Sequence, residues 1–251
     1  MQLLHAQRRA ILEDGYVHLP GVVPRAMVDA ALRAINASVG EGLPPEDLPI
    51  LSAQSYCPEV RETPVITGLF NDTPVRSLLS SVLGVEAPAA VRGQIALRFP
   101  SMRDPLPAPG PHLDGIPTST NGVPAGELYS FTSLVAVFLS DTPAPGMGNF
   151  TVWPGSHNRY AEYLGEHGPE GLIKGKMPVE VGEPRAILAQ AGDAAICHYG
   201  LGHGIWPNGS PHTRYAVFFR VHHPKHQEEK WEVLSDIWRH WPGIREVAES
   251  N

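Results

Sequence analysis

The chain has 251 residues, a mass of 27.2 kDa and a formal net charge of −7 at pH 7. This acidic balance argues against a nucleic-acid-binding protein, which needs a basic face. The sequence starts without the apolar stretch of a signal peptide, and no apolar run reaches the roughly 18 residues of a membrane span. Cys57 and Cys197 form no C-x-x-C pair. We therefore expect one cytoplasmic domain that binds neither nucleic acid nor membrane, since all-β domains reach about 250 residues.

The first part of the chain, residues 1–90, is typical of a helical region. Apolar residues recur at helical spacing in two stretches, which end at Gly15 and Gly40. Thr73 precedes a further amphipathic stretch and is a candidate N-cap. The expected elements are helices at 1–15, 24–40 and 73–84, a short strand at 16–23 and a loop at 41–64.

Beyond residue 90 the spacing of apolar residues changes to the period of two that strands show. Residues 91–99 and 214–223 alternate between apolar and polar side chains, and residues 130–140 form an apolar run typical of a buried strand. We also expect strands at 148–155 and within 185–200, a short helix at 156–164, and a packed helix or a lid at 224–251. Helices followed by many short strands predict a mainly β domain with flanking helices, and a double-sheet jelly roll fits that order.

The strongest turn signal of the chain is the Asn-Gly pair at 208–209. If this pair is the centre of a β-hairpin, His203 and Arg214 lie opposite each other on one face of two paired strands, although two nearby prolines argue for a wider loop. His and Arg disfavour each other's charged form. Their pairing makes sense where a neutral His binds a metal and the Arg binds an anion.

His112 and Asp114 supply the further ligands that such a metal would need. The two residues are separated by one position, and on an extended segment both side chains point to the same face. Together with His203 they give two His and one carboxylate, the facial triad that leaves open positions on iron in non-haem Fe(II) oxygenases. An H-x-D tripeptide alone is a weak signal, but its position well ahead of a His with an Arg eleven residues later is more specific.

The chain resembles the phytanoyl-CoA dioxygenase family of Fe(II)/2-oxoglutarate-dependent oxygenases. The resemblance runs from the segment "DGYVHLPGVV" to the segment "FFRVHH". The motifs that carry it are the H-x-D of His112 and Asp114, the segment "GNFTVWPGSH" at 148–157, and the distal set of His203, Asn208 and Arg214.

The resemblance implies a double-stranded β-helix, the cupin-like jelly roll, over residues 91–223, supported by helical residues 1–90 and followed by a tail. It implies that His112, Asp114 and His203 hold Fe(II). It also implies that 2-oxoglutarate chelates the iron and that its far carboxylate pairs with Arg214, ideally in a bidentate fork. With dioxygen (O2), the expected reaction releases succinate and CO2 and hydroxylates a small organic molecule. The carboxylate of Asp114 favours hydroxylation over halogenation.

Other residues near these motifs have more than one interpretation. Gln94 and Arg98 share the polar face of their strand and either help to bind the co-substrate or face solvent. Ile205 stands where many relatives carry a hydroxyl residue, so one contact to the co-substrate is lost or replaced. We expect His157 to fix a turn, and His198 to be either a core histidine or one that supports a metal ligand. The adjacent histidines at 222–223 are expected to be incidental.

Alternative functions remain open at this point. A metal enzyme of the same fold could carry out desaturation, cyclisation or isomerisation, and a non-catalytic binding protein could keep the fold. The intact set of His112, Asp114, His203 and Arg214 argues against the latter. The sequence names neither the substrate nor the oligomeric state: a free acid, an amine and a natural-product intermediate all fit, while no basic cluster marks an acyl-CoA site.

Overall fold

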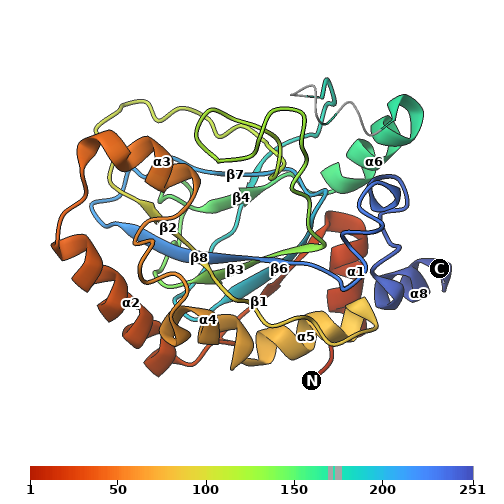
Figure 1. The fold of residues 1–251 in the computed structure, drawn as a ribbon, viewed down its shortest axis with the longest axis horizontal. Helices are drawn as coiled ribbons and strands as arrows, with labels where there is room; N and C mark the ends of the chain where they lie inside the picture. The colour runs from red at the N-terminus through yellow and green to blue at the C-terminus, as the bar shows by residue number, and fades with distance from the viewer. Residues whose placement is uncertain (169–171, 173–176, 251) are drawn as a thin grey trace.

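The computed structural model describes residues 1–168, 172 and 177–250 (Figure 1). Its helices are α1 (His5–Asp14), α2 (Arg25–Gly40), α3 (Leu48–Ala53), α4 (Pro64–Asn71), α5 (Pro74–Leu83), α6 (Ser156–His167) and α8 (Pro242–Glu249), with short 3-10 turns at Pro45–Asp47 and Glu232–Leu234. Its strands are β1 (Tyr16–Leu19), β2 (Gln94–Arg98), β3 (Ser133–Phe138), β4 (Phe150–Val152), β5 (Arg185–Ala186), β6 (Ala194–His198), β7 (His203–Ile205) and β8 (Arg214–Val221). Within these described ranges, none of the helices combines the length and the apolar character that a membrane crossing needs.

The strands form two antiparallel sheets. The larger sheet has the order β1-β6-β3-β8-β2, and the smaller one has the order β5-β4-β7. The smaller sheet lies over one face of the larger sheet, and helices α2, α4 and α5 lie along the other (Figure 1). The rings of Phe150 on β4 and Phe218 on β8 are 5.1 Å apart and join the two sheets. The predicted mainly β architecture with flanking helices is therefore confirmed at this level.

The alternation of β8 explains how one strand serves two layers. Val217, Phe219 and Val221 pack into the apolar cluster under the helices, while Ala216 and Phe218 belong to the cluster between the sheets. A strand turns successive side chains to opposite faces, so a slip of one residue would exchange the two sets. This assignment of faces agrees with the prediction from the sequence.

The helices predicted near the start of the chain are present, and Gly15 ends α1 with a left-handed φ of +83°. A Cβ atom at Gly15 would lie 2.6 Å from Nδ1 of His157, so only glycine fits there. Helices α3 and α4 were not predicted. Helix α4 contains Gly68 and three successive β-branched residues, which lower helix propensity. Its fully buried Leu69 and Phe70 show that tertiary packing stabilises it instead.

The predicted hairpin between His203 and Arg214 is wrong. Strand β7 pairs with β4 in the smaller sheet, whereas β8 pairs with β2 and β3 in the larger one. Asn208 forms a bridge with Met147, and its Nδ2 donates hydrogen bonds to the carbonyl oxygens of Arg98 and His212. The flanking prolines cannot donate to a ladder. The segment between β7 and β8 therefore carries the chain from one sheet to the other.

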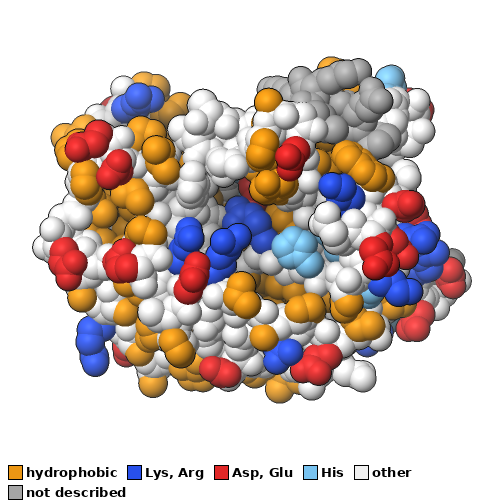
Figure 2. All heavy atoms as spheres, viewed as in Figure 1, with side chains coloured by type: hydrophobic (Ala, Val, Ile, Leu, Met, Phe, Trp, Pro, Cys, Tyr) orange, Lys and Arg blue, Asp and Glu red, His pale blue; other side chains and the backbone are white. Residues whose placement is uncertain are grey.

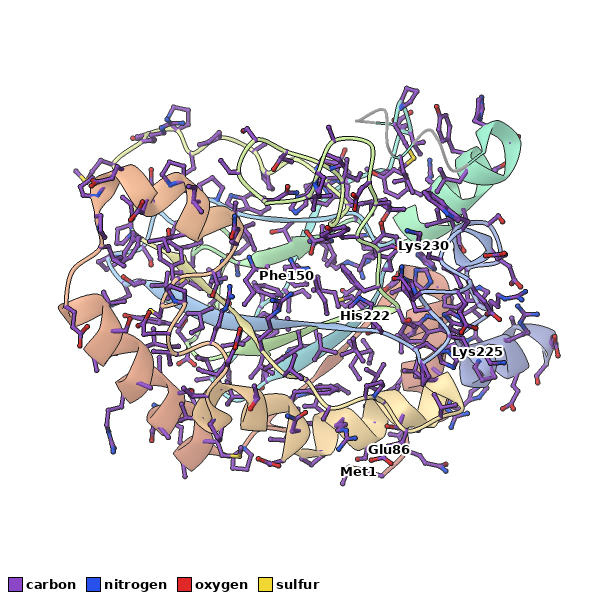
Figure 3. The ribbon with its side chains drawn as sticks, viewed as in Figure 1. Met1, Glu86, Phe150, His222, Lys225 and Lys230 are labelled. Carbon is purple, nitrogen blue, oxygen red and sulfur yellow. The ribbon has the colours of Figure 1, made fainter. Side chains whose placement is uncertain are left out.

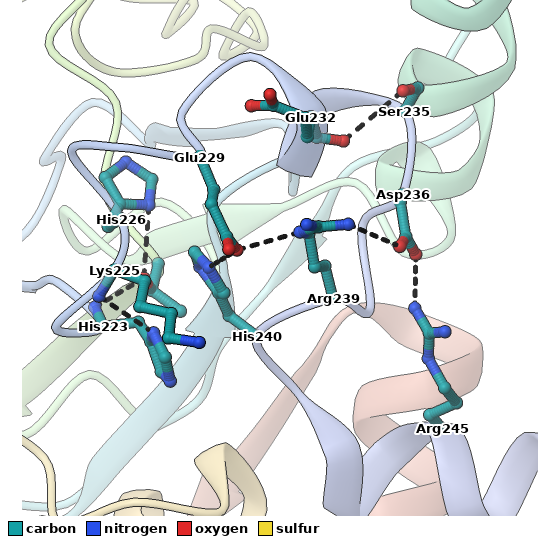
Figure 4. Close-up of polar contacts among 11 residues, drawn as sticks. His223, Lys225, His226, Glu229, Glu232, Ser235, Asp236, Arg239, His240 and Arg245 are labelled. Atoms are coloured by element: carbon teal, nitrogen blue, oxygen red, sulfur yellow. Dashed lines mark hydrogen bonds and ion pairs between the residues drawn. The ribbon is translucent and has the colours of Figure 1, made fainter.

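The C-terminal segment packs against the N-terminal helices rather than forming an isolated tail. Trp241 is buried at the start of α8, and Pro242 contacts Gly84 at the end of α5. Ahead of this helix, Glu229 accepts hydrogen bonds from Nε of Arg239 at 2.8 Å and from Nε2 of His240 at 3.0 Å (Figure 4). This network orders the segment. The division of the chain into helical support, core and tail within a single domain remains a prediction.

Candidate metal centre

His112, Asp114 and His203 converge on a common point. Each offers one ligand atom, and these atoms all lie within 4.8 Å of one another. Oδ1 of Asp114 is 3.5 Å from Nε2 of His112 and 3.6 Å from Nε2 of His203, so it faces both imidazoles. No other group of three His, Cys, Asp or Glu side chains converges in this way in the part of the chain that the structure describes. The three residues predicted as ligands are thus brought together, and their donor set suits a divalent transition metal.

The backbone holds the two histidines side by side. The amide of His112 donates to the carbonyl of His203 at 2.9 Å, and the amide of His203 donates back at 3.1 Å. Asp114 follows two residues later and is held by Oη of Tyr199, which donates to its carbonyl at 3.2 Å. Gly115 then turns the chain with a φ of +80°, and a Cβ there would lie 2.3 Å from the carbonyl oxygen of Tyr129.

The protonation states of the ligands suit metal binding. Nδ1 of His203 lies 3.0 Å from the carbonyl oxygen of Leu201, to which it donates, so Nε2 carries the lone pair. The surrounding protein keeps water from the ring of His112, and this desolvation, together with the imidazole of His203, lowers the pKa of His112. Its imidazole is therefore neutral at pH 7. Burial opposes ionisation of Asp114, but Arg220 and His203 hold the pKa of this carboxyl well below its usual range. Both imidazoles and the carboxylate are therefore ready to bind a cation.

Arg220 is a site residue that the sequence reasoning missed. Its Nε and Nη2 donate to Oδ2 of Asp114 at 3.0 and 2.6 Å, which leaves Oδ1 facing the imidazoles. The signal for it was available, because Arg220 lies six residues after Arg214 and an even step on a strand keeps the same face. The alternation predicted for residues 214–223 puts Arg220 on the polar face of its strand but assigns it no role.

The three candidate ligands open into a cavity of about 700 Å³ between the two sheets. One wall is formed by the polar face of β2 and β8, which contributes Gln94, Arg98, Arg214 and Arg220. Figure 2 shows basic side chains and a histidine gathered around the hollow at the centre of the molecular face that it draws. Figure 3 places Phe150 on β4 near the middle of the molecule and His222 beyond β8.

Arg214 is almost fully buried, with 3% of its surface exposed. Its Nε donates to the carbonyl of Gly148 at 2.7 Å and its Nη1 to the carbonyl of Ala96 at 3.0 Å, while Nη2 is buried without a hydrogen-bond partner. Burial and the nearby Arg98 lower the pKa of Arg214 to about 9, so it stays charged at neutral pH. A buried charged donor without a partner is costly, and a carboxylate in the cavity would supply the missing acceptor.

Gln94 and Arg98 also line the cavity, and their part in binding the co-substrate remains a prediction. Arg98 is the register partner of Arg214 across β2 and β8, and its guanidinium forms no hydrogen bond or ion pair with another described residue. Gln94 donates from Nε2 to the carbonyl of Ala53 at 3.3 Å. Gly148 packs against both arginines, since a Cβ there would lie 3.1 Å from each of their Cβ atoms.

Comparisons with known proteins identify similar folds but no family. No protein-family model matches the chain and no curated protein matches its sequence, so the resemblance to the phytanoyl-CoA dioxygenase family is not confirmed. Solved structures match over most of its length. The non-heme α-ketoglutarate-dependent epimerase SnoN from nogalamycin biosynthesis is 21% identical, with 86% of this chain and 80% of that chain covered and a TM-score of 0.55.

Two further structures extend this comparison. HygX from Streptomyces hygroscopicus, solved with nickel and 2-oxoglutarate bound, is 19% identical over 89% of this chain and 88% of its own, with a TM-score of 0.58. The carbocyclase SnoK from nogalamycin biosynthesis is 20% identical over 91% and 90%, with a TM-score of 0.55. At these identities the likeness establishes the fold. The neighbours include iron- and 2-oxoglutarate-dependent enzymes that catalyse different reactions.

Proposed function

We propose that this chain is an Fe(II)/2-oxoglutarate-dependent oxygenase that acts on a small organic molecule. The observation that carries the proposal is the combination of two elements in one cavity. One is the convergent group of His112, Asp114 and His203, and the other is the buried Arg214 with an unpartnered Nη2. The fold of the neighbouring enzymes supports it, and we extend the proposal to a cupin-like jelly-roll core within a single domain of the phytanoyl-CoA dioxygenase type.

The residues of the site have separate tasks in this proposal. His112, His203 and Asp114 would hold the iron, while Arg220 binds Oδ2 of Asp114 and leaves Oδ1 facing the imidazoles. Arg214 binds the far carboxylate of 2-oxoglutarate, and Arg98 and Gln94 complete that end of the cavity. The bound iron, co-substrate and dioxygen supply the oxidation that releases succinate and CO2.

Hydroxylation is the reaction we propose first, since Asp114 keeps the carboxylate ligand. A second candidate is a reaction that closes a carbon ring or inverts a carbon stereocentre without net hydroxylation. The similarity to an epimerase and a carbocyclase favours it, because both use the same kind of cofactor set on this fold.

The test is an anaerobic titration of the protein with Fe(II) and 2-oxoglutarate. We expect the visible charge-transfer band of an iron-bound 2-oxo acid in the wild type and in Asp29→Ala, a control that removes an exposed carboxylate of α2. Asp114→Ala should abolish the band and, once dioxygen is admitted in a separate assay, the release of succinate. A wild type without the band, or an Asp114→Ala variant that keeps it, contradicts the proposal. Product analysis by mass spectrometry then separates hydroxylation from cyclisation and epimerisation.

A further inference from the structure

We propose that the substrate of this cavity carries an acidic group, a carboxylate or a phosphate, that binds Arg220 beside the metal ligands. The inference rests on the proposed function and specifies the substrate class of the same site. It is carried by the distribution of charge over the cavity wall and by the contacts that Arg220 makes and leaves open.

The cavity wall carries more positive than negative charge. Its charged side chains are Arg98, Arg214, Arg220 and Asp114, and no other Asp, Glu or Lys of the described residues lines it. A divalent metal adds two positive charges and 2-oxoglutarate adds two negative ones, so the loaded site keeps the same excess of two positive charges. A substrate that displaces water from the cavity leaves this excess poorly solvated unless it brings negative charge itself.

The two ends of the cavity differ in what they can offer a substrate. Arg214 is fixed by two backbone carbonyls, and Arg98 lies opposite it in the β2–β8 register. These two arginines are used by the far carboxylate of the co-substrate. Arg220 lies six residues further along β8, next to the metal ligands, and 34% of its side chain is exposed. It is therefore the cation that a substrate can reach.

The contacts of Arg220 leave one edge of its guanidinium open. Nε and Nη2 bind Oδ2 of Asp114, and Nη1 forms no hydrogen bond with another described residue. The ring of Phe131 lies 5.8 Å from Cζ and supports the guanidinium on one side. A held guanidinium with a free donor edge suits an oxyanion, because its planar fork presents donors in fixed directions.

A second arginine adds to the positive charge at this end. Arg92 lies two residues before Gln94, which pairs with Phe218 at the start of β2, and burial, Arg220 and Arg92 together lower the pKa of His222. Arg92 is exposed and makes no ion pair with another described residue. An ammonium group would find no free carboxylate among the described lining residues, since Asp114 is bound to Arg220 and faces both imidazoles. An amine substrate is therefore disfavoured.

The position of Arg220 also limits which carbon is oxidised. Its Nη2 is 2.6 Å from Asp114, whose other oxygen faces both imidazoles. An acidic group on Arg220 thus lies beside the metal, and the carbon that reacts is separated from it by only a few bonds. The remainder of the substrate extends into the apolar part of the cavity around Phe150, Leu134 and Ile116.

The experiment compares matched ligands by isothermal titration calorimetry on the protein loaded with Ni(II) and 2-oxoglutarate, and on the metal-free protein. The probes are phenylacetate, 4-phenylbutyrate and phenyl phosphate, each acid being paired with its carboxamide and the phosphate with phenol. We expect acids to bind at least about tenfold more tightly than their neutral partners, a difference of about 1.4 kcal/mol. The phosphate pair shows which of the two acidic groups is preferred.

Variants assign the preference to Arg220. Arg220→Gln should remove the preference for acids, Arg220→Lys should retain part of it, and Arg33→Gln, an exposed arginine of α2, should leave it intact. Equal binding of acid and neutral partner, including no binding of either, overturns the inference, as does a preference that survives in Arg220→Gln. The charge-transfer band, recorded without these probes, reports the proposed function separately. Circular dichroism identifies a variant that fails to fold. Where metal titration shows that a folded variant no longer binds metal, the comparison on the metal-free protein decides whether Arg220 carries the preference.

Discussion

Two regions of this protein are rich in histidine, and they use the imidazole differently. At the metal site, the Nε2 atoms of His112 and His203 point to a shared carboxylate oxygen at 3.5 and 3.6 Å, beyond good hydrogen-bond distance. Beneath the C-terminal segment, Nε2 of His157 lies 3.1 Å from the carbonyl of Leu12, and Nε2 of His198 lies 2.9 Å from the carbonyl of Ile237.

The comparison shows what separates a ligand from a structural histidine. Burial does not, since His157 is 0% and His203 is 5% exposed. Nδ1 of His157 is buried without a hydrogen-bond partner and faces Gly15, so the difference from a ligand lies in where the second nitrogen points. His198 accepts a hydrogen bond from the amide of Gly200 at Nδ1 and has both nitrogens occupied. His203 binds Leu201 through one nitrogen and keeps the other open toward Asp114.

The largest expected effect separates these two classes directly. His203→Ala should lower the affinity for Ni(II) by more than about 100-fold, because loss of even a supporting residue of a ligand costs about 10–100-fold. His198→Ala should leave metal affinity unchanged and lower the free energy of unfolding instead. Calorimetric titration with Ni(II) and urea unfolding measure the two effects. Equal loss of metal affinity in both variants would refute the distinction.

A smaller effect is expected at the closed end of the cavity. Arg214→Gln should raise the dissociation constant of 2-oxoglutarate about 10–100-fold, since hydrogen bonds to charged groups contribute about 1.5–3 kcal/mol. Metal affinity should stay near the wild-type value, because Arg214 contacts backbone carbonyls and no metal ligand. Titration with each ligand separately tests this. A parallel fall in metal affinity would show that the two ends of the cavity are not independent.

The structural histidines should make the protein sensitive to acid. Burial lowers the pKa of His157 and of His226 to about 4 and that of His198 to about 3, against about 6.5 for each in the unfolded chain. Between about pH 6.5 and 4 the unfolded chain therefore binds more protons, and stability falls as pH falls. Thermal melts should show a midpoint that drops by several degrees over this range. His157→Gln should flatten the dependence, whereas an unaltered slope would contradict it.

The smallest expected effect concerns Gly148, which has a φ of +74°. In Gly148→Ala the new Cβ would lie 3.1 Å from the Cβ atoms of Arg98 and Arg214, tight enough to shift both. We expect about threefold weaker binding of 2-oxoglutarate and a loss of stability of about 1 kcal/mol, since a left-handed conformation costs about that much for alanine. Gly165→Ala, on the open face of α6, is the control: it should leave the binding of 2-oxoglutarate unchanged and should raise stability slightly, because alanine favours a helix more than glycine does.

Much of the fold and of the site could be predicted from local patterns. Alternation in β8 gave the correct faces, and the spacing of His112 and Asp114 led to residues that do converge with His203. The hairpin prediction is wrong because the segment after His203 carries the chain from one sheet to the other. An Asn-Gly pair does not reveal such a long-range connection. The alternation of β8 places Arg220 on the face of Arg214, but its pairing with Asp114, 106 residues earlier in the chain, is not visible in that pattern. Pairings over such distances are set by the sheet topology, which local periodicity does not encode.

Two reciprocal backbone hydrogen bonds join His112 and His203. Because these hydrogen bonds fix the two main chains side by side, the backbone sets the spacing of the two imidazoles before any cation binds. Such a preformed metal site differs from that of small zinc-binding domains, which fold only when the ion binds. Removal of the metal by a chelator should leave this molecule folded and ready for reloading.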